Sequence, residues 1–233
     1  PFVFELIQEA KSLGFITSIP TNGYLINEGY AKKIGESGLD VLVFSLDSMS
    51  DPDVHDMMRG VTGVHEQALK AIDLVRTYSP DTKISLCSII MDTNLDEITA
   101  LRTWAKNNPA ITGIYFMAPM QPNNTRSENA NWWEDPALNT HWPKNIQKAA
   151  EAIDHLLEIM QKEPDHKIAN TDFQLKAFKK YLSDPEHFVK KTTCNLDKAL
   201  HISATGDIFL CYEHRPLGAI TNPDTDIRKL WEN

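Results

Sequence analysis

Two polar clusters each follow a short apolar run, and both contain residue types that bind small polar ligands. The first is Thr21-Asn22-Gly23 and the second is Ser45-Leu46-Asp47. Hydroxyl, amide and carboxylate groups can hydrogen-bond a small polar ligand. Ligands of open α/β sheets bind at the carboxyl ends of the strands, so the position of these clusters indicates a ligand site. Turn chemistry also explains each cluster alone, because Asn-Gly favours a strand-to-helix turn and Asp47 can cap the next helix.

The spacing of apolar residues predicts alternating strands and helices that would position both clusters. Strands are expected at residues 15–19, 41–45, 83–91 and 111–117. Helices are expected at residues 2–13, 27–37, 51–60, 64–78 and 95–106. The near-continuous apolar run at 41–45 is typical of a parallel strand that is covered on both faces. Four strand–helix repeats therefore indicate parallel βαβ units and an α/β fold.

The second half of the chain follows a different pattern. An irregular segment rich in Pro, Asn and Trp precedes two helices, expected at 143–161 and 171–182. Thr171 and Gln174, three residues later, predict a capping box at the second of these helices. A hairpin is expected at 200–212, followed by a short helix at 226–231.

Three tryptophans lie in the irregular segment, at positions 132, 133 and 142. We expect them to form a hydrophobic patch that packs the sheet against the helices. The alternative is a substrate-lining role, because aromatic side chains are frequent in ligand clefts.

Composition excludes several classes of function. The net charge of −9 argues against nucleic acid as the main partner, because phosphate binding requires clustered Lys and Arg. No run of about 18 apolar residues is present, so no transmembrane helix and no membrane partner are predicted. Three cysteines at irregular spacing do not form a disulfide framework, and we therefore expect a cytoplasmic protein. The sequence begins with Pro1, and we expect a chain that is truncated at both ends.

The order and spacing of four motifs resemble those of the radical S-adenosylmethionine (SAM) enzymes. After T-N-G and S-L-D come Arg59-Gly60 and Gly63-Val64-His65, in the order that is typical of that family. The resemblance implies that residues 1–120 form a partial radical SAM core, the last four βα units of a (β/α)6-type barrel. It also implies a [4Fe-4S] cluster whose open iron binds SAM. Reductive cleavage of SAM would yield a 5′-deoxyadenosyl radical, which abstracts hydrogen from a peptide or small-molecule substrate.

The resemblance assigns cofactor-binding roles to residues that match the family motifs. Thr21, Asn22, Ser45 and Asp47 would lie at the strand ends beside SAM, and the hydroxyls of Thr21 and Ser45 would line a common cavity. Arg59 would bind the SAM carboxylate by a bidentate contact. The alternative for Arg59 is a cation that complements the dipole at the end of its helix.

Two further positions match the family outside these motifs. Lys83 corresponds to a lysine that faces the SAM carboxylate, and its alternative is a solvated charge at the start of a strand. Met120 corresponds to a position beside the adenine, and its alternative is core packing. His55 is expected to be an ordinary polar position.

The cysteines add a second resemblance, to enzymes with a SPASM or twitch extension. Cys194, Gly206 and Cys211 form a C-x11-G-x4-C pattern, and residues 191–233 are expected to begin such a domain after the helical segment 121–190. Cys194 and Cys211 would then help to hold an auxiliary Fe–S cluster, because two thiolates alone are too few. Cys87 lies in an apolar strand and is expected to be a buried, inert thiol.

The C-x3-C-x2-C loop of the family is not in this sequence. The ligands of the first cluster are therefore expected outside this chain, and the chain alone is expected to be inactive. No catalytic residue is assigned within it. The resemblance also implies an electron donor such as flavodoxin or ferredoxin as a partner.

Two alternatives stay open at this point. The offset from Cys194 to Cys211 equals the outer cysteine spacing of molybdopterin-precursor cyclases, but Asp197 stands where those enzymes have a middle cysteine. The other alternative is a non-catalytic module that keeps the radical SAM fold for binding.

Overall fold

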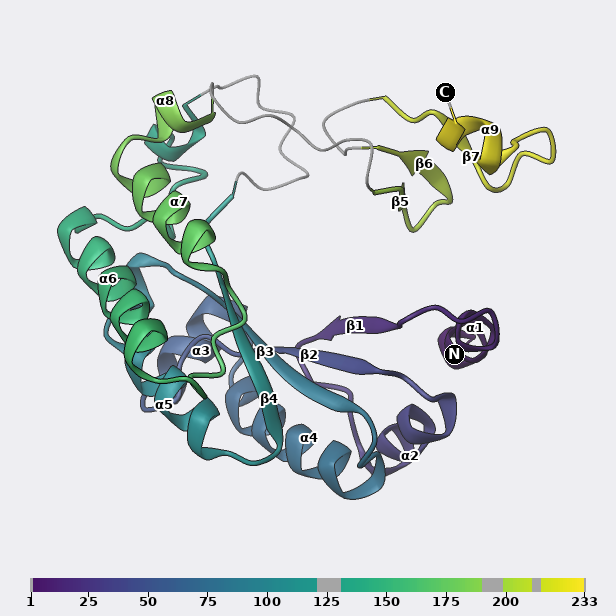
Figure 1. Ribbon diagram of the computed structural model, residues 1–233, viewed down its shortest axis with the longest axis horizontal. Coiled ribbons are helices and arrows are strands. Elements are labelled where there is room, and N and C mark those ends of the chain that lie inside the picture. Colours follow the sequence, from purple (N-terminus) through teal and green to yellow (C-terminus); the bar gives the residue numbers. More distant parts are fainter. Residues whose placement is uncertain (1, 121–130, 190–198, 211–214, 233) are drawn as a thin grey trace.

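A parallel sheet of four strands forms the centre of the molecule (Figure 1). The computed structural model describes residues 2–120, 131–189, 199–210 and 215–232. The strands are adjacent in chain order: β1 (Ser18–Thr21), β2 (Val41–Ser45), β3 (Lys83–Ile89) and β4 (Ile111–Met117). All three pairings are parallel, which confirms the expected α/β fold.

Helices cover one face of this sheet. After α1 (Val3–Ser12), the connecting helices are α2 (Glu28–Ser37), α3 (Pro52–Arg59), α4 (Val64–Tyr78) and α5 (Glu97–Asn107). Successive strand residues point to opposite faces, and those directed at the helices, such as Phe44 and Leu86, are completely buried. The opposite face carries the half-buried side chains of Ser45, Cys87 and Tyr115. We call it the open face.

The outer edge of β4 is paired with an extended segment rather than left free. The Ile114 N–H donates to the Lys167 carbonyl and the Ala169 N–H donates to the Ile114 carbonyl, each over 2.8 Å. The buried Asn170 side chain continues this pattern, because it accepts from the Phe116 N–H at 2.7 Å and donates to the Phe116 carbonyl at 2.9 Å. Residues 167–170 therefore satisfy backbone groups that an edge strand would otherwise expose.

Two packed helices, α6 (Ile146–Lys162) and α7 (Asp172–Ser183), follow, with α8 (Pro185–Val189) after them. The predicted capping box at α7 is confirmed, since Thr171 and Gln174 each accept from the backbone N–H of the other. The predicted tryptophan patch is also confirmed. The Trp142 ring lies 5.5 Å from that of Trp132 and 5.2 Å from that of Tyr181.

The C-terminal part is a small antiparallel sheet with a helix. It consists of β5 (His201–Ile202), β6 (Asp207–Phe209), β7 (Gly218–Ala219) and α9 (Ile227–Glu232), and it lies apart from the larger sheet in Figure 1. The predicted hairpin is confirmed in a shorter form, with Gly206 at a φ of +89° in its turn. Cys194 and Cys211 lie outside the described residues, as does Asp197.

The first predicted strand is misplaced. Residues 15–19 were expected to form it, but Phe15 and Ile16 are 62% and 85% exposed and precede β1. Hydrogen bonding to the neighbouring strand starts later, where the Val41 N–H donates to the Thr17 carbonyl at 3.1 Å. Apolar character alone therefore predicted the wrong bounds for this strand. The strand begins where hydrogen bonding to β2 begins.

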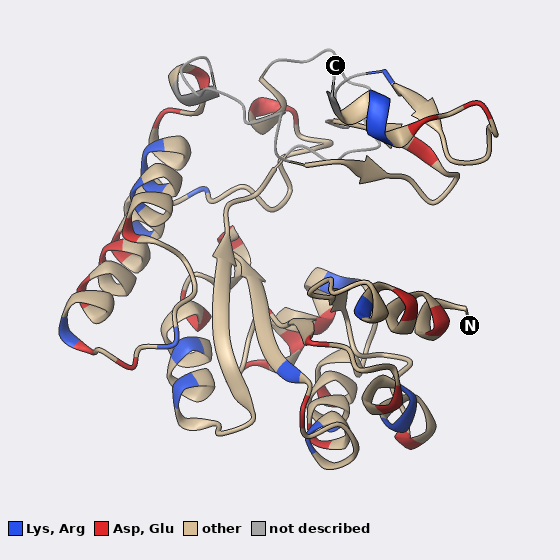
Figure 2. Ribbon diagram, turned by 45° about the vertical axis from the view of Figure 1, so that its right-hand side comes forward, with Lys and Arg blue, Asp and Glu red and all other residues tan. Residues whose placement is uncertain are grey.

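Charged residues lie mainly on the helices and loops (Figure 2). Lys83 is the one charged residue in strands β1 to β4, all of which are described. Within the described parts of the chain, no helix has the length and apolar character that crossing a membrane requires.

Replacing Asn170 with Ala should destabilise the fold. The change leaves the buried N–H and carbonyl of Phe116 without their partners, and we expect the free energy of unfolding to fall by about 2–4 kcal/mol. Urea denaturation of Asn170→Ala measures this loss. Asn107→Ala, at an exposed helix end, is the matched control and should change little. Equal stability of both variants would contradict the role given to residues 167–170.

Candidate functional site

The carboxylate of Asp47 is completely buried just beyond the end of β2. Its Oδ1 accepts from the Ile89 N–H at 3.2 Å and lies 3.5 Å from the Ser88 hydroxyl. Its Oδ2 forms an ion pair with Nη2 of Arg59, from the last turn of α3. Asp47 does not cap the next helix, because Asp51 occupies the N-cap of α3. The structure thus assigns Asp47 to an internal ion pair at the carboxyl end of the sheet.

His55, which we expected to be an ordinary polar position, is a completely buried part of this ion-pair site. The Asp47 N–H donates to His55 Nδ1 over 3.2 Å. Because Nδ1 accepts, it carries no hydrogen, and the ring proton of the neutral form is on Nε2. The His65 ring lies 5.7 Å away in an edge-on arrangement. Burial lowers the pKa of His65, and the nearby His55 lowers it further.

Asp56, the next residue along α3, fixes the start of α4. Its carboxylate accepts from the N–H groups of Gly63 and His65, and these backbone hydrogen bonds lower the pKa of Asp56. Gly63 has a φ of +81°, a left-handed conformation that favours glycine. The H-D-M-M-R-G segment therefore connects α3 to the end of β2 on one side and to α4 on the other.

Glu97 at the start of α5 organises the loop that follows Asp47. Its Oε2 accepts from the Ser48 hydroxyl at 2.8 Å and from the N–H groups of Met49 and Ser50 at 2.9 and 2.7 Å. Burial raises the pKa of Glu97, but these hydrogen bonds outweigh it and lower the pKa to about 2. The sequence analysis did not single out Glu97, because its partners are backbone N–H and hydroxyl groups some 47 to 49 positions away.

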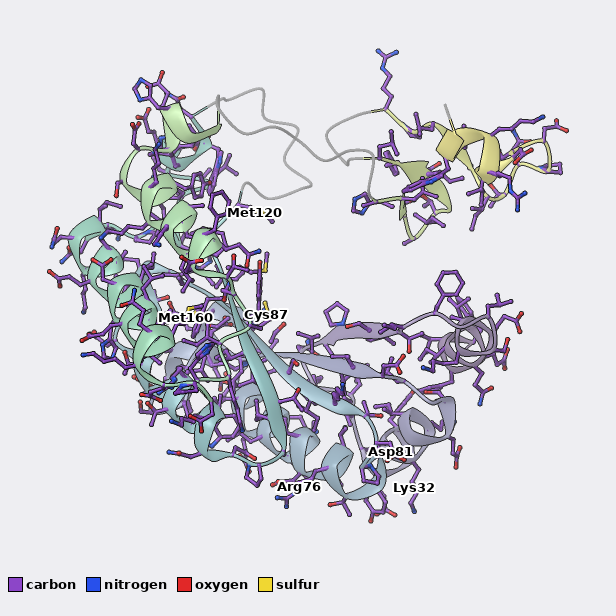
Figure 3. The ribbon with its side chains drawn as sticks, in the orientation of Figure 1. Lys32, Arg76, Asp81, Cys87, Met120 and Met160 are labelled. Atoms are coloured by element: carbon purple, nitrogen blue, oxygen red, sulfur yellow. The ribbon has the colours of Figure 1, made fainter. Side chains whose placement is uncertain are left out.

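Ser45 lies on the open face beside this ion pair. Its register partner is Cys87, labelled in Figure 3, and its hydroxyl has no hydrogen-bond partner within the described part of the chain. Burial raises the pKa of the Cys87 thiol, the charge of Asp47 raises it further, and the charge of Arg59 lowers it. The raised pKa agrees with an inert Cys87, although the side chain is half-buried rather than buried.

The expectation that Thr21 and Ser45 line a common cavity is wrong. Thr21 is paired with Phe44, one residue out of phase with Ser45, and paired residues point to the same face of a sheet. Thr21 therefore faces the helices, where it lines an apolar cavity with Leu42 among other residues. Its hydroxyl accepts from the Gly23 N–H at 3.0 Å, and Gly23 has a φ of +76°, which agrees with the turn interpretation.

The other candidates lie at different distances from the ion pair. Lys83 begins β3, six residues before Ile89, which places it about 20 Å from the carboxyl end of the sheet. Its position does not support a contact with the same ligand. Met120 is 64% exposed three residues after β4, beyond the carboxyl end in Figure 3. Asn22 is exposed after β1, and its side-chain oxygen accepts from the Tyr24 N–H at 3.1 Å.

Metal binding was considered for the described side chains of the site. Within the described ranges, no three or more His, Cys, Asp or Glu side chains form a group able to hold a metal ion. Cys194 and Cys211, the expected ligands of an auxiliary cluster, fall in the ranges that the structure does not describe.

The part of the chain that contains this site matches a known family model. Residues 1–105 match the model of the Radical SAM superfamily. This part of the chain is therefore similar to the Radical SAM superfamily. The matched region contains strands β1 to β3 and the motifs around Asp47 and Arg59.

Similar proteins cover the rest of the chain as well. An AdoMet-dependent heme synthase from Methanosarcina barkeri is 23% identical over the whole chain, which spans 65% of that protein. A second AdoMet-dependent heme synthase, from Oleidesulfovibrio alaskensis, is 32% identical over 83 residues, 36% of this chain and 21% of that protein. This chain thus spans less than two thirds of the curated relatives it matches.

Two solved structures share the fold of this chain. Streptococcus suis SuiB bound to S-adenosylmethionine superposes with a TM-score of 0.64 at 16% identity, over 99% of this chain and 51% of SuiB. The anSMEcpe structure with bound AdoMet and Cp18Cys peptide gives a TM-score of 0.57 at 16% identity, over 93% of this chain and 57% of that one. At this identity the likeness establishes the fold.

Replacing Glu97 with Gln should remove a contribution to stability that depends on pH. At neutral pH the free energy of unfolding should fall by about 1–3 kcal/mol, because a charged acceptor is lost. The folded pKa of about 2 lies below the unfolded value, so the contribution is complete above the unfolded pKa and is lost as pH falls toward 2.

Urea denaturation of the wild type and of Glu97→Gln over a pH series tests this difference. The two proteins should differ most at neutral pH and converge in acid. Glu9→Gln changes an exposed carboxylate of the same type and should follow the wild type at every pH. A difference that persists unchanged at the lowest pH would contradict the role given to the Glu97 carboxylate.

Proposed function

We propose that this chain is part of a radical SAM enzyme and that SAM binds on the open face, at the carboxyl end of the larger sheet. The observation that carries the proposal is the position of two uncommitted donors. Nε of Arg59 is buried without a hydrogen-bond partner in the described part of the chain, and the side chain is 25% exposed. The Ser45 hydroxyl nearby is likewise unpartnered there. Such donors fit the carboxylate of an amino acid.

Each candidate residue then has a stated task. Arg59 would bind the SAM carboxylate, while Asp47 holds the guanidinium in place from within the protein. Ser45 would donate its hydroxyl to the same amino-acid part. The exposed Met120 would pack against the adenine, and Asn22 would offer its amide nitrogen to the ribose. Thr21 and Lys83 are left out, because one faces the helices and the other lies at the opposite edge of the sheet.

The chemistry of the reaction comes from bound cofactors. When bound, a [4Fe-4S] cluster and SAM supply the reductive cleavage that initiates hydrogen abstraction from the substrate. We propose that the cluster ligands lie outside these 233 residues, so that the chain alone is inactive. We also propose that residues 191–233 begin a SPASM or twitch domain, in which Cys194 and Cys211 bind an auxiliary cluster. A cytoplasmic flavodoxin or ferredoxin would supply the electron.

The substrate class is best stated as a peptide or a small molecule. The relative from Methanosarcina barkeri favours one specific candidate, because its 23% identity extends over the whole chain. We therefore propose a tetrapyrrole precursor of heme as the first substrate to test. Heme formation by the reduced enzyme, followed by absorbance spectroscopy and mass spectrometry, would support it, and SAM cleavage without any change in the tetrapyrrole would count against it.

Replacing Arg59 with Ala should weaken SAM binding. Loss of one hydrogen-bonded ion pair corresponds to a rise of about tenfold to a hundredfold in the dissociation constant. Isothermal titration calorimetry of the full-length protein, expressed from its complete reading frame under anaerobic conditions, measures this change. Arg76→Ala removes an exposed arginine at the other end of the sheet and is the matched control. If both variants bind SAM like the wild type, Arg59 is not a ligand.

Metal analysis of the same full-length protein tests the enzyme class. A radical SAM enzyme should contain about four irons and four sulfides per chain for each cluster. With dithionite as reductant, it should convert SAM to methionine and 5′-deoxyadenosine. A protein that contains no cluster and leaves SAM intact would instead support a non-catalytic binding module.

A further inference from the structure

We infer that His55 is a positioning residue for SAM binding, which acts through Asp47 on Arg59. The inference rests on the proposed function, because it concerns the orientation of the residue proposed to bind the SAM carboxylate. His55 and Asp47 are both completely buried, so neither is available to a ligand. Their effect on SAM must therefore pass through Arg59, the partly exposed member of the group.

The first step is the hydrogen bond from the backbone of Asp47 to His55. The Asp47 N–H is directed at Nδ1 of His55 over 3.2 Å, and no other hydrogen bond of this N–H occurs among the described residues. A buried N–H without an acceptor is costly, so this bond fixes the backbone where β2 ends. The imidazole ring thereby determines the direction in which the Asp47 side chain leaves the backbone.

The second step is the division of the Asp47 carboxylate between two partners. Oδ1 accepts from the Ile89 N–H on β3, which leaves Oδ2 to the guanidinium of Arg59. Nδ1 of His55 lies 3.6 Å from Oδ2, too far for a hydrogen bond, so it does not compete with Arg59. With Nη2 held in this way, the guanidinium of Arg59 has a fixed direction, and its exposed part stays available to a ligand.

The third step is the placement of His55 and Arg59 on one helix. They are four residues apart on α3, and this spacing puts both side chains on the same face. The other charged or titratable groups near His55 are Asp56 on α3 and His65 on α4. Asp56 is engaged with the backbone of α4, which leaves Asp47 as the group through which His55 acts.

Three substitutions separate the acceptor role of His55 from its bulk. His55→Asn keeps an acceptor oxygen the same number of bonds from the backbone as Nδ1, whereas His55→Gln moves it one bond further and His55→Leu removes it. In the full-length protein, His55→Leu should weaken SAM binding about tenfold. His55→Asn should stay within about threefold of the wild type, and the measurement is equilibrium titration with SAM.

A double-mutant cycle with Arg59 distinguishes positioning from general destabilisation. If His55 acts through Arg59, His55→Leu should have no further effect on SAM binding in the Arg59→Ala background. The Michaelis constant for SAM should rise while kcat for SAM cleavage stays unchanged, because binding alone is affected. Thermal unfolding of each variant shows whether it is folded.

The outcomes are decisive in each direction. Wild-type affinity in His55→Leu, or an equal loss in the Arg59→Ala background, would overturn the inference. If His55→Leu does not fold, the comparison of His55→Gln with His55→Asn decides, and equal affinities would overturn it. A wild-type protein that binds no SAM at all contradicts the proposed function instead, which separates the two failures.

Discussion

The buried negative charge of Asp47 is the constraint on which the arrangement of the site depends. A carboxylate removed from water is stable only if charged or hydrogen-bonding partners replace the solvent. Here the partners come from β3 and α3, so the ends of three elements must meet at one point. Removing one partner of such a buried pair typically costs about 3–5 kcal/mol, far more than an exposed ion pair contributes. The charge therefore fixes where β2 ends and how α3 lies against it.

Side chains near this charge also hold the loop after β2 in place through hydrogen bonds. The Asn94 side chain donates to the carbonyl of Asp47 at 3.0 Å and to that of Ile89 at 2.9 Å, and Glu97 binds the following residues. A site whose supporting groups are already paired loses little freedom when a ligand binds. Among the described residues around this loop, the unpaired groups include the Ser45 hydroxyl, part of the Arg59 guanidinium and Nε2 of both His55 and His65. Rigid support with a few uncommitted donors is the arrangement that a binding site requires.

Sequence reasoning succeeded where the local pattern decides the structure. The strands at 41–45 and 111–117 and the helix at 64–78 have the predicted bounds, because apolar periodicity and turn residues define them. It failed where pairing decides. A register difference of one residue sends Thr21 to the helix side, and no local signal reveals it. His55 was underestimated although a signal existed, since its spacing to Arg59 places both on the face of α3 that meets β2.

The H-D-M-M-R-G segment shows why a motif can matter to a ligand that most of its residues never touch. His55 and Arg59 both contact Asp47, and the intervening Asp56 binds the first N–H groups of α4. Gly60, at a φ of +66°, ends α3 immediately after Arg59, so the chain turns away before a further side chain can crowd the guanidinium. The motif thus specifies the length and the orientation of one short helix. A substitution within it changes the direction of Arg59 and, through it, whatever the open face binds.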